Sequence, residues 1–508
     1  MSLKRILKLL AAFLTGQGVT IVTQLLVPPL FLHRYAHGVQ VYGEWVALTA
    51  AVAYLNTLNY GIQSYANNQM GIHYNRGELE EAKAVQASAL LLLLVVTLVL
   101  SCASATILLM PLGQWLGLEQ VSSRAASITV FLLVIQLIVS WGSALLAGSY
   151  LAIGEAHRGQ NWLSAQRLVS ALAMAAFLWE RASFPVLALT QLASVVAFLI
   201  LIAVDIRVHA PILLPALKYG SWRQATAMIR PTGYFMLLAV SSFLTWQGPI
   251  LLIQRILGST SVAIFALSRI VFSMSRYFLS IFTFALSQDI THLVGQRNWL
   301  QLRRLYELSE KVILLLVPAV TIGTLLMSPL LFTIWLHNRS LFHPGICLLM
   351  AMVSAAIAVK EHKYQFQWSS NEHTSLSKFL LAAYSAMLVV AGFLLKPLGI
   401  GSLLVVWLVT ECVVVAYILR LNVKLFPKEL KISQAPVMRL AAVLAAVFAL
   451  AAWPSRESAH WPLGWVAAAG CASTALLLAA DYFIFDLREV RSVFENRLRR
   501  RFASVDSV

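Results

Sequence analysis

Charged residues are scarce in this 508-residue chain, where Asp, Glu, Lys and Arg together make up only 12% of the sequence. Long polar stretches are nearly absent too, and the longest are 67–85, 207–230 and 288–309. None of these is long enough to fold around a hydrophobic core of its own. The sequence therefore excludes a large soluble domain and, with it, a soluble active site.

Motifs for nucleotide binding, hydrolysis and metal binding are absent as well. There is no GxxxxGK[ST] phosphate loop to drive an ATPase, no HExxH zinc motif and no nucleophile elbow. The cysteines fall at unrelated spacings within apolar segments, as is typical of small buried side chains. They are Cys102, Cys347, Cys412 and Cys471. We therefore expect neither an enzyme nor a bound metal or cofactor.

Hydrophobic segments of membrane-spanning length fill the chain instead. Hydrophobic residues make up 59% of the sequence, and the mean hydropathy is +0.78. A helix of roughly 20 apolar residues crosses a hydrocarbon core of about 30 Å. We predict an all-α polytopic membrane protein with about fourteen transmembrane helices, at residues 6–32, 40–66, 86–110, 123–149, 160–179, 184–206, 231–254, 260–287, 310–335, 343–366, 376–395, 399–422, 436–453 and 463–484.

The net charge of +17 arises from basic residues at the ends of these segments. They form no soluble basic patch with interleaved aromatic residues, so we exclude nucleic acid as a partner. When successive loops are assigned to alternate sides, 29 of the 38 Lys and Arg residues fall on one side and 7 on the other. Basic loops favour the cytoplasmic side, which predicts cytoplasmic N- and C-termini. The high Ala and Leu content and the lack of a targeting signal favour a bacterial cytoplasmic (inner) membrane.

A short internal similarity divides the chain into two halves. The block from Phe31 to Tyr42 is similar to the block from Leu251 to Val262, at an offset of 220 residues. Six spans separate the copies, so the repeat is parallel, with a pseudo-two-fold axis along the membrane normal. The stretch 77–88 has the pattern of a short interfacial helix. We predict a six-helix lobe at 1–208, an amphipathic cytoplasmic linker at 209–230, a second six-helix lobe at 231–425, two additional transmembrane helices at 426–485 and a basic cytoplasmic tail at 486–508.

Two arginines lie inside a predicted span. Arg269 and Arg276 are seven residues apart, hence on nearly one helical face, and too deep to reach the membrane surface easily. A charge at the bilayer centre costs about 2.5–3.5 kcal/mol or more, so it needs a partner or a hydrated cavity. Guanidinium groups bind phosphate in bidentate fashion, which makes the two residues a candidate anion site. The alternative is a structural ion pair with Glu411 or Asp289.

Uncharged polar residues follow one face of each of the first two spans. Gln17 and Gln24 share a face with Thr20, and Asn56 lies on a polar face of the next span. Amide groups suit sugar hydroxyls, but they also form hydrogen bonds between helices. Gln17, Gln24 and Asn56 are therefore candidates either for a substrate path or for helix packing.

Few acidic residues lie deep enough to bind a coupling ion. Glu411 and Asp481 fall within predicted spans, and Glu411 is our candidate for coupling to H⁺ or Na⁺. The sequence leaves the identity of the ion open. Glu44, at the mouth of the second span, is expected to pair with Arg34 or His33.

The order of short motifs along 10–420 resembles a known transporter superfamily. The motifs are Gly18, Pro28-Pro29, Tyr42-Gly43-Glu44-Trp45, Asn59-Tyr60-Gly61, Pro231-Thr232-Gly233-Tyr234 and Phe265-Ala266-Leu267-Ser268-Arg269. They resemble the polysaccharide, or lipid-linked oligosaccharide, flippases of the multidrug/oligosaccharidyl-lipid/polysaccharide (MOP) exporter superfamily. The O-antigen flippases, or Wzx-type proteins, are the best-known branch of this group.

The resemblance implies a MATE-like fold, with two six-helix lobes around a central cavity and two extra C-terminal helices. It implies that alternating access flips an undecaprenyl-pyrophosphate-linked oligosaccharide to the periplasmic leaflet, for O-antigen (lipopolysaccharide) or exopolysaccharide biosynthesis. Arg269 and Arg276 would then meet the lipid pyrophosphate. The implied partners are this lipid-linked oligosaccharide, membrane lipids, a polysaccharide polymerase and glycosyltransferases.

Three other functions stay open. A cation-coupled exporter of multidrug type or of other small molecules would need an acid deep in a cavity, such as Glu411. A flippase for the peptidoglycan lipid precursor would share the anion site. A membrane enzyme of glycan assembly would be expected to carry a substantial periplasmic loop, which this chain lacks.

Overall fold

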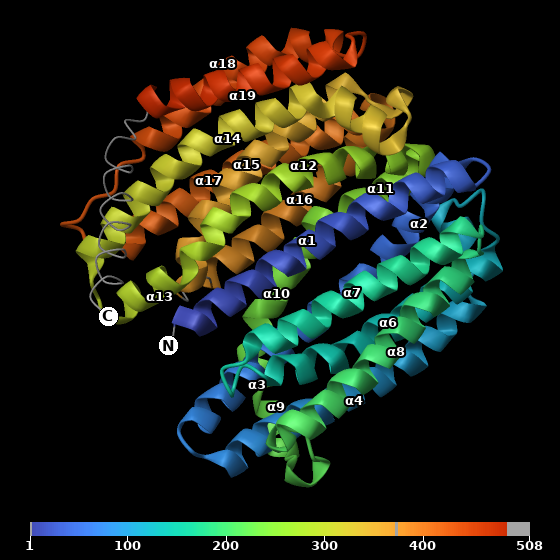
Figure 1. Ribbon diagram of the computed structural model, residues 1–508, viewed down its shortest axis with the longest axis vertical. Helices are drawn as coiled ribbons and strands as arrows, with labels where there is room; N and C mark the ends of the chain where they lie inside the picture. Colours follow the sequence, from blue (N-terminus) through green and yellow to red (C-terminus); the bar gives the residue numbers. More distant parts are fainter. Residues whose placement is uncertain (1–2, 371–373, 485–508) are drawn as a thin grey trace. The chain divides into compact units, whose positions relative to one another are not determined.

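The computed structural model describes residues 3–370 and 374–484, and within them every regular element is helical (Figure 1). Five short 3-10 turns, η1 to η5, join some of the α-helices. The α-helices are α1 (Leu3–Arg34), α2 (Gly38–Val52), α3 (Asn56–Asn75), α4 (Leu79–Ala105), α5 (Leu112–Leu116), α6 (Ser123–Ser149), α7 (Ala156–Trp179), α8 (Phe184–His209), α9 (Trp222–Ala227), α10 (Ile229–Trp246), α11 (Gly248–Leu257), α12 (Ser259–Ala285), α13 (Ser287–Gly295), α14 (Trp299–Leu336), α15 (Pro344–Ser369), α16 (Thr374–Leu398), α17 (Ile400–Leu425), α18 (Ala435–Glu457) and α19 (Leu463–Ile484).

The described residues contain thirteen helical segments long and apolar enough to cross a membrane, and these match thirteen of the predicted spans. The remaining prediction, 40–66, falls on a broken helix. α2 ends at Val52, η1 occupies Ala53–Leu55, and α3 begins at Asn56. The many Asn, Gln and Tyr residues of α3 make it too polar to be counted by hydropathy.

The chain divides into two compact units, of which the first comprises the residues up to Ala266 together with Ser377–Lys396. In this unit α6 packs along α8, α1 along α7, and α3 against α4 and α10. Small residues allow these helices to approach closely: a Cβ on Gly159 of α7 would lie 2.0 Å from the carbonyl oxygen of Ala147 on α6. Side-chain volume at such positions would therefore separate the helices.

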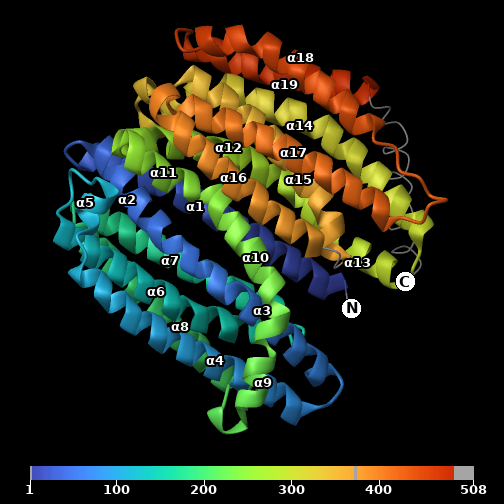
Figure 2. The ribbon, with the colours of Figure 1, turned by 180° about the vertical axis from the view of Figure 1, so that it is seen from behind.

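The second unit comprises Leu267–Leu376 and the residues from Pro397 onward. Its longest helix, α14, packs against α15, α18 and α19, while α15 also packs along α17. Figure 2 shows the two C-terminal helices, α18 and α19, running side by side. At one end of the unit, aromatic side chains of Tyr306, Phe366 and Phe426 form a buried cluster.

The stretch 77–88 and the predicted linker 209–230 pack against each other within the first unit. The η4 turn and α9 lie on the first turns of α4. Gln86 Nε2 donates to the Leu213 carbonyl oxygen at 2.7 Å, and Ser88 Oγ donates to Gln224 Oε1 at 3.0 Å. The prediction of a separate interfacial helix at 77–88 is wrong, because residues from Leu79 onward are the beginning of the long helix α4.

A break between α10 and α11 divides the next predicted span. α10 ends at Trp246, and Pro249 occupies the first turn of α11. A proline has no backbone N–H to donate and is accommodated at a helix start, so it favours a new helix at this point. The turn from α11 into α12 passes through Gly258, whose φ of 84° is strained for any other residue.

Candidate functional site

The second unit contains a charged turn in the membrane-spanning helix α15. Lys360, Glu361 and Lys363 lie within four successive residues, and each of these side chains forms an ion pair with a different neighbouring helix. Successive helical residues point about 100° apart, so one turn can reach three partners around it. The charged side chains thus link α12, α14, α15 and α17 inside the unit.

The first ion pair joins α12 to α15. Arg276 Nη1 donates to Glu361 Oε1 at 2.6 Å, and the two side chains remain 16% and 27% exposed. The Arg276 guanidinium also lies 5.1 Å from the ring centroid of Tyr277. Arg276 therefore combines a short charge-assisted bond with access from outside the packed helices.

The second ion pair joins α15 to α17. Lys360 Nζ lies 2.9 Å from Glu411 Oε2, and the indole Nε1 of Trp407 donates to Glu411 Oε1 at 3.0 Å. Glu411 is fully buried, which confirms the expectation that this acid lies deep. Because its charge is already balanced by Lys360, an incoming cation would have to displace the ammonium group.

The third ion pair, between Lys363 of α15 and Glu310 of α14, is the most enclosed. Both side chains are buried, and Lys363 Nζ lies 4.0 Å from the ring centroid of Tyr306. The Asn422 amide donates to the Lys363 carbonyl oxygen at 3.0 Å. His362, also fully buried, is 2.9 Å from Ser309 Oγ through Nε2. This end of the network is a buried structural core, in which His362 Nδ1 is left without a hydrogen-bond partner among the described residues.

Both candidate anion residues lie partly buried on α12. Arg276 does form an ion pair, but its partner is Glu361 rather than Glu411 or Asp289, since Glu411 pairs with Lys360. Arg269, two turns earlier on α12, is partly buried. The binding of an anion by Arg269 and Arg276 stays a prediction.

The first unit holds the polar residues predicted on spans one and two. Gln17 and Gln24 lie partly buried on the same face of α1 as Thr20. Gln63 of α3 donates through Nε2 to the Ala144 carbonyl oxygen of α6 at 2.9 Å, which is the helix-packing role of such amides. The side chain of Asn56 lies outside the part of the chain that the structure describes. A role of Gln17, Gln24 and Asn56 in a substrate path stays a prediction.

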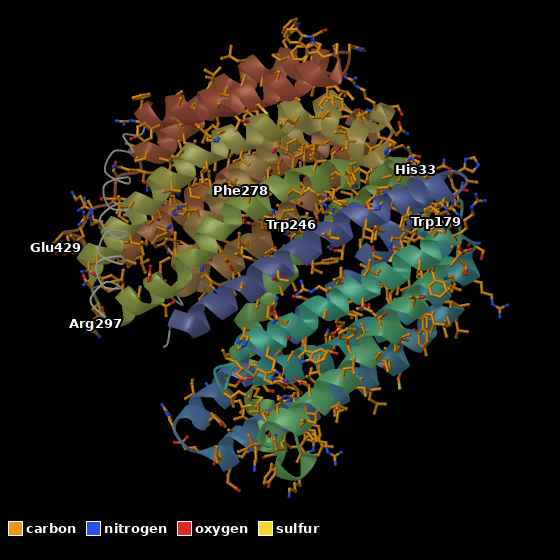
Figure 3. The ribbon with its side chains drawn as sticks, in the orientation of Figure 1. His33, Trp179, Trp246, Phe278, Arg297 and Glu429 are labelled. Atoms are coloured by element: carbon orange, nitrogen blue, oxygen red, sulfur yellow. The ribbon has the colours of Figure 1, made fainter. Side chains whose placement is uncertain are left out.

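Glu44 ties the loop after α5 to α2. Its buried carboxylate accepts hydrogen bonds from the backbone N–H groups of Glu119, at 2.6 Å, and Gln120, at 2.8 Å. The expected pairing of Glu44 with Arg34 or His33 is therefore wrong. Arg34 instead donates to the Trp179 carbonyl oxygen at 2.7 Å and stacks on its ring, and Figure 3 shows the ends of α1 and α7 meeting there. Both backbone donors bind Oε1, and the buried Oε2 has no hydrogen-bond partner in the described part of the chain.

A second connection at the same loop brings α11 and α12 into contact with α2. The Gln254 side chain donates through Nε2 to the Leu116 carbonyl oxygen at 3.1 Å and to Ser259 Oγ at 3.1 Å. A Cβ on Gly43 of α2 would lie 1.9 Å from the Ser259 carbonyl oxygen, so the backbones of α2 and α12 touch. These contacts close one end of the first unit.

An ion cluster joins α6, α7 and α8 at the other end of the same unit. Asp205 accepts from Arg158 Nε at 2.8 Å and from Arg158 Nη2 at 2.6 Å, a bidentate arrangement. Tyr150 and the Trp162 indole also donate to its carboxylate. The Asp205 carboxylate is thus saturated with donors, which favours a structural role for this acid over ion coupling. Among the described residues no group of three or more His, Cys, Asp and Glu could hold a metal ion.

Comparison with solved structures shows which fold these units form. An inward-facing MATE-family multidrug resistance transporter of the MOP superfamily has a TM-score of 0.62 at 13% identity, over 84% of this chain and 95% of that chain. The MATE multidrug transporter DinF-BH gives 0.61 at 16% identity, over 82% and 95%. The lipid II flippase MurJ, in an inward closed conformation, gives 0.58 at 11% identity, over 94% and 99%.

The MurJ match covers more of this chain than either of the two MATE matches does. The 6% of this chain left unmatched by MurJ is too short to contain both α18, of 23 residues, and α19, of 22 residues. No protein-family model matches the sequence, and no curated protein does so. At these identities the similarity establishes architecture, and it confirms the predicted all-α, MATE-like fold class. This chain has the fold of the MOP-superfamily transporters.

Proposed function

We propose that this protein flips an undecaprenyl-pyrophosphate-linked oligosaccharide from the cytoplasmic to the periplasmic leaflet of a bacterial inner membrane by alternating access. The observation that carries the proposal is the ion pair between Arg276 and Glu361. It is partly exposed within a membrane-spanning helix, so a pyrophosphate can take the place of the carboxylate. The likeness to the lipid II flippase MurJ, whose name gives it a lipid-linked cargo, supports the same class of substrate.

The chemistry of the exchange follows from the properties of guanidinium. Arg276 holds one carboxylate oxygen at 2.6 Å, and a phosphate group offers the same acceptor geometry with more negative charge. Arg269 and Lys360 add positive charge nearby on α12 and α15. The anion therefore finds a site whose basic groups are already oriented, which lowers the cost of binding.

The same site would serve a flippase for the peptidoglycan lipid precursor. The observation in favour of this second candidate is the MurJ match over 94% of the chain. A cation-coupled exporter of small molecules is supported by the likeness to MATE multidrug transporters, but Glu411, its candidate ion site, already binds Lys360 at 2.9 Å.

In the proposed pathway of the oligosaccharide flippase, glycosyltransferases build the oligosaccharide before transport, and a polymerase extends it afterwards.

The test is complementation of a deletion strain. We expect deletion to abolish surface polysaccharide and to trap lipid-linked intermediates in the cytoplasmic leaflet, with wild type restoring both. Arg269→Ala/Arg276→Ala should fail to restore them, because the anion loses both guanidinium partners. Arg420→Ala, an exposed arginine on α17, is the matched control and should restore them fully.

Each alternative has its own result in the same strains. Normal surface glycan after deletion, with loss of viability on depletion, would assign the protein to the peptidoglycan precursor. Full rescue by a stably expressed double variant would refute the arginine site. A transport defect in Glu411→Gln, without one in the arginine variants, would favour the cation-coupled exporter.

A further inference from the structure

The first unit contains an arginine in the middle of a candidate membrane span. Among the described residues, the partners of this arginine are all neutral. Arg167 lies near the centre of α7, a candidate membrane span. Its Nη1 donates to Thr20 Oγ1 at 3.3 Å and its Nε to the Leu163 carbonyl oxygen at 3.4 Å. Both bonds are long for a charged donor, and the described residues give Arg167 no ion pair. The count of basic residues by side placed Arg167 with the cytoplasmic set, although the predicted span 160–179 contains it.

The exposed Arg167 side chain lies on a different face of α7 from the exposed apolar side chains. Gln160, Ser164 and Ala171 share its helical face, and Ser164 and Ala171 are buried. The exposed apolar side chains, Val169 at 44% and Leu172 at 52%, lie about 200° and 140° around the helix from Arg167. The guanidinium is therefore accessible on the side of α7 that packs against α1.

The facing side of α1 is polar in the same way. Thr20 lies one turn from Gln17 and one turn from Gln24, whereas exposed Leu14 and Val22 are on other faces. One turn below Thr20, a Cβ on Gly16 would lie 2.9 Å from Gln160 Nε2 and 3.0 Å from Ser164 Oγ. The two helices thus touch at Gly16, and one turn farther along α1 the Thr20 hydroxyl contacts the Arg167 guanidinium.

The Arg167 guanidinium has unused N–H donors, and the described neighbouring groups provide no negative charge to compensate its positive charge. Guanidinium carries five N–H donors, of which two are used here in long bonds to neutral oxygens. A charge at this depth costs about 2.5–3.5 kcal/mol or more unless water or an anion reaches it. By contrast, Arg276 in the second unit holds a carboxylate at 2.6 Å. To bind a phosphate, Arg276 would have to release this carboxylate, whereas Arg167 has no carboxylate among the described residues to release. Arg167 is therefore the better placed of the two arginines to bind an anion.

We propose that Arg167, with Thr20 and Gln24 beside it, forms a phosphate-binding subsite of the first unit. It takes a phosphate ester in bidentate fashion, and the Gln24 amide donates to a remaining oxygen. The Thr20 hydroxyl, which here donates to the Gly16 carbonyl oxygen at 3.0 Å, would redirect its hydrogen to the phosphate. The inference rests on the proposed function for its preferred ligand, the pyrophosphate of the lipid-linked substrate. A phospholipid headgroup offers the same chemistry and is the second source.

The experiment measures binding by the purified full-length protein in phosphatidylcholine nanodiscs. The probes are undecaprenyl pyrophosphate, undecaprenol, which lacks the phosphates, and phosphatidylglycerol as competitor. The variants are Arg167→Gln, Arg167→Lys and, as matched control, Arg207→Gln at an exposed position on α8. We expect Arg167→Gln to weaken undecaprenyl pyrophosphate binding about tenfold, the loss of one charge-assisted bond, with Arg167→Lys intermediate. Undecaprenol binding and the Arg207→Gln values should not change.

The outcomes separate the two phosphate sources and the two proposals. If Arg167→Gln abolishes competition by phosphatidylglycerol but leaves the affinity for undecaprenyl pyrophosphate unchanged, the subsite is supported. Its ligand is then a phospholipid headgroup. Unchanged affinity for both phosphate ligands overturns the subsite, including when the melting temperature falls, because that result assigns Arg167 a purely structural role. Wild-type protein that binds phosphatidylglycerol through Arg167 but not undecaprenyl pyrophosphate contradicts the proposed function and leaves the subsite standing. Defective rescue by Arg269→Ala/Arg276→Ala, together with normal binding by Arg167→Gln, supports the proposed function and overturns the subsite.

Discussion

The two units treat charge inside the membrane differently. In the second unit, Lys360, Glu361 and Lys363 of α15 each meet an opposite charge on a neighbouring helix. In the first unit, Arg158 and Asp205 pair near the end of a span, while Arg167, at mid-span, meets only a hydroxyl and a carbonyl oxygen. One unit neutralises its buried charges internally, and the other leaves a cation that an anion can complete. We infer that the ion pairs of the second unit mainly hold four helices together, with the partly exposed Arg276–Glu361 pair as its ligand site, whereas Arg167 in the first unit is available to an anion without such an exchange.

The largest effect should come from breaking the buried pair of the second unit. Lys363→Met leaves Glu310 as a buried charge without its partner, which we expect to cost about 3–5 kcal/mol of unfolding free energy. The measurement is the melting temperature and the yield of monodisperse protein. The double variant Lys363→Met/Glu310→Leu should recover most of the loss. A Lys363→Met protein as stable as wild type would show that the ion pairs do not hold this unit together.

The first unit should respond most to side-chain volume. Gly43→Ala forces a Cβ to 1.9 Å from the Ser259 carbonyl oxygen, so α2 and α12 must separate at an expected cost of about 1–3 kcal/mol. Gly18→Ala on α1, where no atom lies within 4 Å of the new Cβ, is the matched control and should be neutral or slightly stabilising. Thermal unfolding of both variants measures the difference. Equal stability of the two would mean that the close approach of α2 and α12 contributes nothing.

One residue of the second unit departs from the pattern of paired charges. Asp481 of α19 is fully buried, and neither carboxylate oxygen has a hydrogen-bond partner. Asp481→Leu removes this unsatisfied group, so we expect a gain of at least about 1 kcal/mol in unfolding free energy. The melting temperature of the variant checks it. A loss of transport despite higher stability would reveal that Asp481 serves function at the expense of stability.

The smallest effect concerns the exposed ion pair. Glu361→Gln removes the carboxylate that competes with an incoming anion for Arg276, so undecaprenyl pyrophosphate should bind about threefold more tightly. Equilibrium binding at low and moderate salt measures the change. Weaker binding would indicate that Glu361 orients Arg276 rather than competing for it, and the two units would then differ less than we infer.

Much of the architecture could be predicted from the sequence because each span carries its own signal. A run of apolar residues long enough to cross the bilayer identifies itself without its neighbours, and thirteen spans agree with the structure. The second span is harder to recognise by hydropathy, since α3 is polar and η1 separates it from α2. The start of α7 was placed four residues late, at 160 rather than Ala156, but Arg167 lies well inside both ranges.

The partners of the polar residues could not be predicted in the same way. Spacing placed Arg269 and Arg276 on one face of a helix, and Gln17 and Gln24 on another. It could not show that Glu361 faces Arg276, or that Thr20 faces Arg167, because these partners are 85 and 147 residues apart in the chain. Glu44 illustrates the limit, since its partners are backbone N–H groups of a distant loop, which leave no mark in side-chain composition.

The sequence by itself determined that this protein is a bundle of membrane-spanning helices, because the hydrocarbon core requires long apolar segments with internally bonded backbones. It also determined which residues share a helical face, since the helical repeat fixes that locally. Only the tertiary structure decided which helix each face meets. Electrostatic compensation depends on distances of a few ångströms between side chains, and packing alone brings Lys360 to Glu411 while leaving Arg167 beside neutral groups.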